Sequence, residues 1–226
     1  MIIAAPVRAL IFDFDGVLAD TEGVHCAAFQ SALAGVGIVL SHDDYFTRFL
    51  GLPDRDCLAA ACVRAGVDAG AAQIEALLAR KRAEFAARAQ TAGLYAGVAE
   101  TLRRLHDDFV LAIASGAFRD EIEPILQRAG VRPLFTAVVG AEDVMRGKPA
   151  PEPFLRALQA VNATQDVPVS AAECVVIEDA PRGVEAAHAA GMRCIAVTTH
   201  YDRGALGAAD AVVERVSQLR PEDLGR

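Results

Sequence analysis

The chain of 226 residues carries 30 acidic and 22 basic side chains, which gives a formal net charge of −8 at pH 7. At ~100–200 residues per domain, this length fits one large domain or one domain with a smaller insertion. The acidic balance disfavours nucleic acid and anionic membranes as partners, because both attract clustered positive charge. The apolar runs are shorter than the roughly 20 residues of a membrane span, and the N-terminus lacks the basic stretch of a secretory signal. We therefore expect a cytoplasmic protein.

The five cysteines, at positions 26, 57, 62, 174 and 194, are odd in number and form no C-x-x-C pair. These spacings support neither a zinc site nor a disulfide framework. We expect reduced, buried thiols, since free cysteine packs as a small apolar side chain.

Short apolar runs alternate with helical stretches along most of the chain. Strands are predicted at 7–12, 109–114, 136–139, 173–177, 193–197 and 211–213. Helices are expected near 97–107, 119–129, 151–162 and 180–190. Continuous apolar strands that alternate with helices indicate a parallel sheet covered on both faces. The sequence therefore predicts a Rossmann-like α/β core.

Residues 22–92 interrupt this alternation. They are rich in alanine and charge, with helical periodicity in segments such as AAQIEALLARKRAEFAARAQ, and their seven basic and eight acidic side chains nearly cancel. The segment is too long for an ordinary connection between a strand and a helix. We expect residues 21–93 to form an all-helical cap subdomain and residues 1–20 and 94–226 to form the core, with hinges at the junctions.

The first predicted strand runs directly into the sequence DFDG. Asp13 and Asp15 are two residues apart, so in an extended chain their side chains point the same way. Gly16 allows the chain to turn sharply. Ligands of open parallel sheets bind at the carboxyl ends of the strands, and two adjacent carboxylates repel each other unless a cation or a proton lies between them. A turn with solvated aspartates is the alternative interpretation.

Three further polar features follow predicted strands. Ser115 and Gly116 combine a hydroxyl with a residue that lets backbone N–H groups approach an anion, before a helix N-terminus that favours negative charge. Lys148 lies in the proline-rich loop RGKPAPEPF and is one of only two lysines among 22 basic residues, which suits a compact charge directed at a phosphate oxygen. Glu178 and Asp179 follow the fourth strand and resemble a Mg²⁺ site. Helix caps or a surface lysine would explain each feature singly; together they converge on one edge of the sheet.

The segments DFDGVLADTE, SGA, GKPAPEPF and VIEDAPRGVEAAHAAGM closely resemble the four motifs of the haloacid dehalogenase-like superfamily. The subgroup that the chain resembles contains β-phosphoglucomutase and small-molecule phosphatases with a helical cap after the first motif. The resemblance spans nearly the whole chain. The order of the four motifs and the spacing between them both agree with the superfamily.

The resemblance implies a role for each motif residue. Asp13 would be the nucleophile that becomes an aspartyl phosphate, and Asp15 the general acid and base. Ser115, Gly116 and Lys148 would hold the phosphoryl oxygens. Mg²⁺ would be bound by Asp13, the backbone carbonyl of Asp15, and Asp179, with Glu178 in support.

Asp15 argues against dehalogenation, because dehalogenases of this superfamily protonate no leaving oxygen. Phosphonoacetaldehyde hydrolases need a cap lysine, and Lys81 in ARKRAEF reads as a solvated charge. Receiver domains of signalling relays, which store an aspartyl phosphate, are smaller and lack an inserted cap.

The choice between phosphatase and mutase depends on the cap. Thr21, His25 and Arg55 match positions of the β-phosphoglucomutases, whereas Glu22 is common in phosphatases of the subgroup. Leu50 replaces a mutase lysine, and Ala117 and Phe118 replace polar residues that bind a second phosphate. We favour a Mg²⁺-dependent phosphatase acting on a small sugar phosphate-like metabolite, as a monomer, with a phosphosugar mutase as the alternative.

Overall fold

The computed structural model describes residues 6–224. The chain divides into two compact units: a core formed by residues up to Asp20 together with those from Gly93 onward, and a second unit formed by Thr21–Ala92. Among the described residues, none of the helices combines the length and the apolar character needed to cross a bilayer.

The core is built on a six-stranded sheet in which every paired strand runs parallel, with the order β3-β2-β1-β4-β5-β6. The strands are β1 (Ala9–Phe12), β2 (Val110–Ala114), β3 (Phe135–Val139), β4 (Cys174–Glu178), β5 (Arg193–Val197) and β6 (Ala211–Val213). All six lie where the apolar runs predicted them, with boundaries displaced by one or two residues at most. The predicted Rossmann-like α/β core is confirmed.

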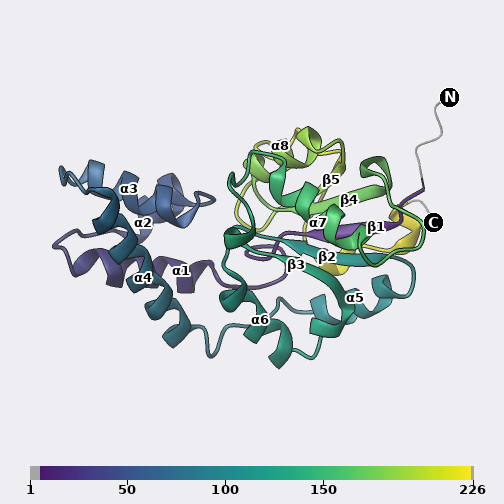
Figure 1. The fold of residues 1–226 in the computed structure, drawn as a ribbon, viewed down its shortest axis with the longest axis horizontal. Coiled ribbons are helices and arrows are strands. Elements are labelled where there is room, and N and C mark those ends of the chain that lie inside the picture. Colours follow the sequence, from purple (N-terminus) through teal and green to yellow (C-terminus); the bar gives the residue numbers. More distant parts are fainter. Residues whose placement is uncertain (1–5, 225–226) are drawn as a thin grey trace. The chain divides into compact units, whose positions relative to one another are not determined.

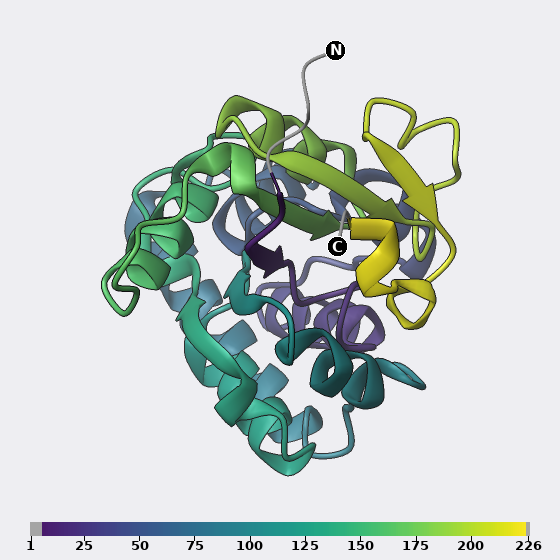
Figure 2. The same ribbon diagram turned by 90° about the vertical axis from the view of Figure 1, so that its right-hand side faces the viewer.

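Four helices connect these strands: α5 (Val98–His106), α6 (Arg119–Arg128), α7 (Glu152–Asn162) and α8 (Pro181–Ala189). Helices α7 and α8 cover one face of the sheet, and α5 and α6 lie on the other (Figure 1). Right-handed crossovers require this division, because the chain moves from β1 outward to β3 and then returns to build β4 to β6 in the opposite direction. The view in Figure 2, turned by 90°, shows the helices on both sides of the strands.

The central strands are apolar on both faces, as a sheet covered by helices requires. One face of β1 contributes Ala9 and Ile11 to a cluster with Phe154 of α7 and Val184 of α8. Short 3₁₀ turns complete the core, at Arg132–Leu134, Ala141–Asp143, Ala171–Glu173, Val216–Gln218 and Pro221–Leu224. All five cysteines of the chain are buried free thiols, as expected.

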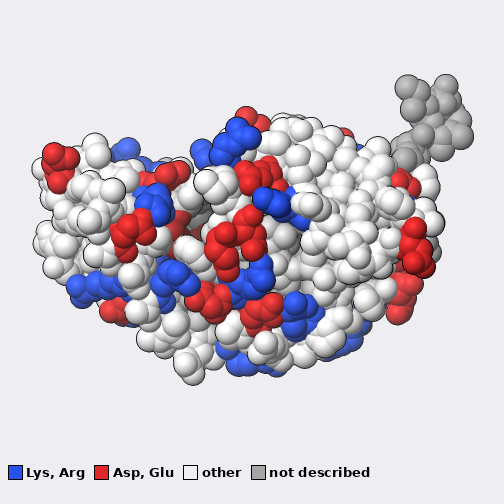
Figure 3. All heavy atoms as spheres, viewed as in Figure 1, with Lys and Arg blue, Asp and Glu red and all other residues white. Residues whose placement is uncertain are grey.

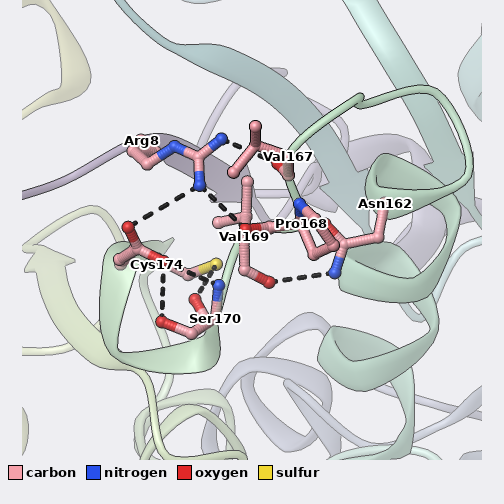
Figure 4. Close-up of polar contacts among 8 residues, drawn as sticks. Arg8, Asn162, Val167, Pro168, Val169, Ser170 and Cys174 are labelled. Atoms are coloured by element: carbon pink, nitrogen blue, oxygen red, sulfur yellow. Dashed lines mark hydrogen bonds and ion pairs between the residues drawn. The ribbon is translucent and has the colours of Figure 1, made fainter.

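A polar network fastens the loop between α7 and β4 at the amino-terminal edge of the sheet (Figure 4). Arg8, just before β1, donates hydrogen bonds to the carbonyl oxygens of Val167 and Pro168, both at 2.8 Å. The Asn162 amide bonds both the N–H and the carbonyl of Val169, at 2.8 and 2.9 Å. This edge is therefore fixed by structural contacts, while the carboxyl-terminal edge carries the polar residues considered below.

The second unit is helical throughout its regular structure. It contains α1 (Glu22–Ala34), α2 (His42–Asp44), a π-helical turn (Tyr45–Phe49), α3 (Asp54–Arg64) and α4 (Ala71–Arg88). Helix α4 packs against both α1 and α3. Apolar residues from all three helices, including Phe29, Leu58 and Phe85, form its buried interior. The helical character expected for the insertion is thus observed.

Candidate active site

The first two aspartates are positioned by the end of β1 and the tight turn after it. The N–H of Asp13 continues the sheet by donating to the carbonyl of Ile177 at 2.9 Å. The turn closes with hydrogen bonds from Gly16 N to Ala19 O and from Leu18 N to Phe14 O, at 3.0 and 2.9 Å. Asp13 is buried and Asp15 is half-buried. Both aspartates thus lie at the carboxyl-terminal edge of the sheet.

Gly16 allows Asp179 to approach this turn. Its φ of +74° is in the left-handed region, which glycine adopts without a steric cost. A Cβ at Gly16 would lie 2.2 Å from Oδ2 of Asp179 and 2.8 Å from Nδ1 of His200. The absence of a side chain here is therefore required by the carboxylate that packs behind it.

The loop after β2 carries Ser115 and Gly116. Ser115 is buried, and its Oγ accepts a hydrogen bond from the N–H of Ala117 at 3.1 Å. A Cβ at Gly116 would meet no heavy atom within 4 Å, so packing does not require glycine there. The first amides of α6 are occupied by protein carboxylates: Phe118 N–H donates to Glu121 at 3.0 Å, and Arg119 N–H to Glu142 at 3.1 Å.

Lys148 brings a positive charge into the carboxylate cluster. Its Nζ lies 2.7 Å from Oδ1 of Asp13 and 2.6 Å from Oε1 of Glu178. It also lies 5.0 Å from the centre of the Phe154 ring, at cation–π distance. The Arg182 guanidinium donates a hydrogen bond of 2.7 Å to the backbone carbonyl of Lys148 and so holds its loop against α8.

Glu178 is the last residue of β4, and its carboxylate is almost fully buried. Its Oε2 accepts hydrogen bonds from the N–H groups of Asp179 and Ala180, at 2.8 and 3.0 Å. A Cβ at Gly183 would lie 1.9 Å from the carboxyl carbon of Glu178. Helix α8 therefore needs glycine at this position for Glu178 to occupy its place.

The cluster contains more negative than positive charge. Ligand oxygens of Asp13, Glu178 and Asp179 all lie within 4.8 Å of one another, and Lys148 supplies one countercharge. Burial raises the pKa of Asp13 well above its ordinary value; Lys148 opposes this rise, and Glu178, Asp179 and Asp15 add to it. Burial alone would lower the pKa of Lys148, but the carboxylates of Asp13 and Glu178 raise it above its ordinary value.

This donor set fits a hard divalent cation. Three buried carboxylates repel one another, and one lysine leaves their charge incompletely balanced. Mg²⁺ prefers carboxylate oxygens together with water. The residues that the sequence singled out at three strand ends thus form a group that could hold such an ion.

Replacing Gly183 with alanine is expected to displace Glu178 while leaving the rest of α8 a good helix, because alanine favours helices. Catalytic turnover should fall by roughly 10–100-fold, the usual cost of disturbing a residue that supports a metal site. Steady-state kinetics would measure the loss. Gly70→Ala is the matched control, because a Cβ there meets nothing within 4 Å. Equal activity of the two variants would contradict the packing argument.

The remaining sequence candidates belong to the second unit. Thr21 is fully buried at the start of α1. Glu22 accepts a hydrogen bond of 2.7 Å from the Tyr45 hydroxyl, and the buried His25 packs on the Phe85 ring with centroids 4.3 Å apart. Arg55 is exposed on α3 and forms an ion pair with Glu75. Glu22, His25 and Arg55 therefore each contact a residue of their own unit.

The interpretation of Lys81 as a solvated charge is wrong. Its side chain is completely buried, its Nζ lies 2.7 Å from Oδ2 of Asp54, and the ring centres of Phe29 and Phe85 are 5.3 and 5.0 Å away. The buried residues of α4 include Ile74, Leu77, Leu78, Lys81 and Phe85. This spacing defines one face of a helix, so Lys81 lies on the inward stripe although arginines flank it in the sequence.

Sequence reasoning missed three residues of the core site. His200 contacts Asp179, with Nδ1 2.8 Å from Oδ2. Arg182 supports the Lys148 loop, and Gly183 makes room for Glu178. His200 follows the end of β5, so the rule that places ligand sites beyond parallel strand ends could have found it. Arg182 and Gly183 lie within the motif segment VIEDAPRGVEAAHAAGM, but their contacts with the Lys148 loop and with Glu178 could be found only in the packed structure.

Fold and site together define an α/β enzyme with a carboxylate cluster at the carboxyl edge of a parallel sheet and a helical insertion after the first strand. A family model described as "Haloacid dehalogenase-like hydrolase" matches residues 10–197. The chain belongs to this family.

Similar proteins cover nearly the whole chain. Protein CbbY of Rhodobacter capsulatus is 32% identical over 207 residues, covering 88% of each chain. Validoxylamine A 7'-phosphate phosphatase of Streptomyces hygroscopicus subsp. limoneus is 30% identical over 223 residues, covering 96% of this chain and 98% of the relative. A β-phosphoglucomutase from Clostridium difficile shares the fold, with a TM-score of 0.84 and 22% identity over 96% of this chain and 95% of its own.

Proposed function

We propose that this chain, a phosphoric monoester hydrolase, is a Mg²⁺-dependent phosphatase that hydrolyses a small sugar phosphate-like metabolite through an aspartyl phosphate on Asp13. The observation that carries the proposal is the buried cluster in which Lys148 lies 2.7 Å from Asp13 and 2.6 Å from Glu178. A carboxylate can attack an anionic phosphoryl group only where nearby positive charge offsets their repulsion.

In the first half-reaction, an Asp13 carboxylate oxygen attacks phosphorus, and the bond from phosphorus to the ester oxygen breaks. Asp15 gives its proton to the departing oxygen, so the alcohol leaves neutral. In the second half-reaction, Asp15 takes a proton from water while the water oxygen attacks phosphorus. Inorganic phosphate leaves, and the Asp13 carboxylate is regenerated.

The residues proposed to hold Mg²⁺ are Asp13, the backbone carbonyl of Asp15, and Asp179, with Glu178 in support. The proximity of the Asp13, Glu178 and Asp179 carboxylates supports the assignment of these three residues. When bound, the ion would supply positive charge that offsets the charge on the phosphoryl oxygens.

The Ser115 hydroxyl, the Gly116 N–H and the Lys148 ammonium are proposed to hold the phosphoryl oxygens. Ser115 comes from the loop after β2, which neighbours β1 in the sheet, and Lys148 from the segment after β3, which lies on the other side of β2. Since the first amides of α6 already bond Glu121 and Glu142, the helix N-terminus contributes less to this site than the Ser115–Gly116 loop itself.

We propose that the helical segment over residues 21–93 is a cap that closes over substrate, while residues 1–20 and 94–226 carry the chemistry. The two ends of the insertion leave the core side by side: Asp20 N–H bonds Gly93 O at 3.1 Å, and Ala19 pairs with Leu94 in an antiparallel bridge. Such a junction suits a hinged lid that excludes water. A lid also favours a small substrate over a phosphoprotein.

A phosphosugar mutase is the second candidate, supported by Thr21, His25 and Arg55. Two observations favour the phosphatase. Ala117 and Phe118 offer no side-chain donors for a second phosphate, and the Ala117 N–H already bonds Ser115. The name of the Streptomyces relative, validoxylamine A 7'-phosphate phosphatase, is consistent with this choice.

One experiment separates the two functions. The protein would be incubated with Mg²⁺ and a panel of phosphorylated sugars and sugar acids, and released phosphate measured. In parallel, β-glucose 1-phosphate with catalytic β-glucose 1,6-bisphosphate would be assayed for glucose 6-phosphate. Phosphate release from panel members supports the phosphatase. Glucose 6-phosphate formed without phosphate release would overturn it in favour of the mutase.

Arg55→Ala is expected to raise KM for the natural substrate and to leave hydrolysis of a small aryl phosphate unchanged. The physical reason is that a cap residue contacts the part of the substrate beyond its phosphoryl group, whereas the chemical step depends on the core. Glu75→Ala is the control, because it frees Arg55 from its ion pair without removing the guanidinium. Equal loss on both substrates would count against a specificity role for Arg55.

A further inference from the structure

His200 lies in the core at the carboxyl-terminal edge of the sheet, three residues beyond the end of β5. Its Nδ1 is 2.8 Å from Oδ2 of Asp179, and the two side chains are only 14% and 8% exposed. The imidazole also packs against the DFDG turn, because a Cβ on Gly16 would lie 2.8 Å from Nδ1. The histidine thus bridges the first motif and the Glu178–Asp179 pair.

We propose that His200 is a positioning residue that orients the Asp179 carboxylate for a divalent cation. The inference rests on the proposed function, because it assumes that Asp179 helps to hold Mg²⁺. An ionised carboxylate only accepts hydrogen bonds, so the contact requires Nδ1 to carry a proton and to donate it to Oδ2. One oxygen of Asp179 is thereby fixed, which sets the direction in which the carboxylate faces the cluster.

The need for such a contact follows from the charges in the cluster. Three carboxylates held close together repel one another and would otherwise rotate apart. Asp13 is held by Lys148 at 2.7 Å, and Glu178 is held by two backbone N–H groups at 2.8 and 3.0 Å. Asp179 is held by Nδ1 of His200, at 2.8 Å from its Oδ2. Partners that fix metal-ligating carboxylates commonly set metal affinity, and their loss costs about 10–100-fold.

The choice of substitutions separates orientation from packing. His200→Ala removes the donor and the ring together. His200→Asn keeps an N–H donor near the position of Nδ1, because its amide nitrogen is the same number of bonds from Cβ. His200→Gln places its amide one bond further out. If His200 orients Asp179, the affinity for a divalent cation should decrease from histidine to asparagine and then to glutamine and alanine. A role in packing alone does not predict this order.

The chain offers a matched control in His188. It also pairs with an aspartate, with Nε2 3.0 Å from Oδ2 of Asp210, but 40% of its side chain is exposed and it lies on α8 away from the carboxylate cluster. His188→Ala therefore removes a histidine–aspartate contact of similar length without touching Asp179.

The primary measurement is binding of Mn²⁺ alone to metal-free protein, followed by the electron paramagnetic resonance signal of the free ion. We expect His200→Ala to weaken binding about 10–100-fold, with His200→Asn near the wild-type value and His188→Ala unchanged. Turnover of His200→Ala supports the positioning role if the Mg²⁺ concentration for half activation rises above that of the wild type while kcat at saturating Mg²⁺ returns to the wild-type value. Thermal unfolding in a chelator would show that each variant is folded.

Two results would overturn the inference while leaving the proposed function intact. In the first, wild type and His200→Ala bind Mn²⁺ equally. In the second, His200→Asn loses as much affinity as His200→Ala and unfolds at the same lowered temperature, which assigns the residue to packing. Absence of Mn²⁺ binding by the wild type would instead refute the metal site of the proposed function, and the inference with it.

Discussion

Asp13→Asn is expected to abolish phosphate release, with a loss on the order of 10⁶-fold, as when another covalent nucleophile is removed. The neutral amide is a poor nucleophile and cannot form the acyl phosphate bond. Incubation with ³²P-labelled substrate, followed by acid quenching, should label the wild-type chain transiently and leave the variant unlabelled. Retained activity or retained labelling would remove Asp13 from the covalent step.

The same substitution is expected not to lower the unfolding temperature in a chelator. Burial and the neighbouring carboxylates raise the pKa of Asp13 in the folded chain. A carboxyl group whose pKa is raised on folding binds protons better when folded, so at neutral pH its ionised form disfavours the folded state. Asparagine removes that penalty, although it also removes the ion pair with Lys148.

Asp166→Asn is the control for both measurements, because Asp166 is exposed in the loop before β4. It should leave turnover and unfolding temperature at the wild-type values. A large drop in unfolding temperature for Asp13→Asn, beside an unchanged Asp166→Asn, would mean that the ion pair with Lys148 outweighs the repulsion within the cluster.

Lys148→Met is expected to reduce turnover by at least about 10²–10³-fold, the usual cost of losing one group that stabilises developing charge in a transition state. Methionine keeps most of the volume of the lysine side chain but supplies no charge. Stability in a chelator should fall by about 3–5 kcal/mol, since breaking a buried ion pair leaves carboxylates uncompensated.

A divalent cation should restore part of this stability. If Mg²⁺ binds beside Asp13 and Asp179, it replaces the missing positive charge, so it should raise the unfolding temperature more in Lys148→Met than in the wild type. Thermal unfolding of both proteins with chelator and with Mg²⁺ measures the difference. The same Mg²⁺-induced shift in the two proteins would contradict the shared electrostatic role of the lysine and the cation.

Much of the core could be predicted from the sequence because its signals are local. An apolar strand covered on both faces is a continuous apolar run, and Asp13, Ser115 and Asp179 each follow such a run directly. Parallel strands bring their carboxyl ends to one edge, so the order of strands and polar residues already implied a cluster. Lys148 was identified by its rarity and by its rigid, proline-rich loop.

The wrong prediction for Lys81 also has a physical origin. The charged neighbours of Lys81 suggested an exposed position, but helical periodicity places it four residues before the buried Phe85. The local composition shows only that α4 carries charged side chains. The packing of α4 against α1 and α3 determines which of these side chains is buried. There Asp54 and two aromatic rings compensate the buried ammonium.

The sequence by itself determined the α/β fold, the helical insertion, the family and the residues at the strand ends, because each depends on order and periodicity along the chain. The tertiary structure decided which of these residues touch. Lys148 meets Asp13 across 135 positions of sequence, and His200 meets Asp179 across 21. It also decided that Gly16 and Gly183 are required, since their missing side chains make room for carboxylates of another segment. Contacts of this kind depend on distances between separate elements, which arise only when those elements pack.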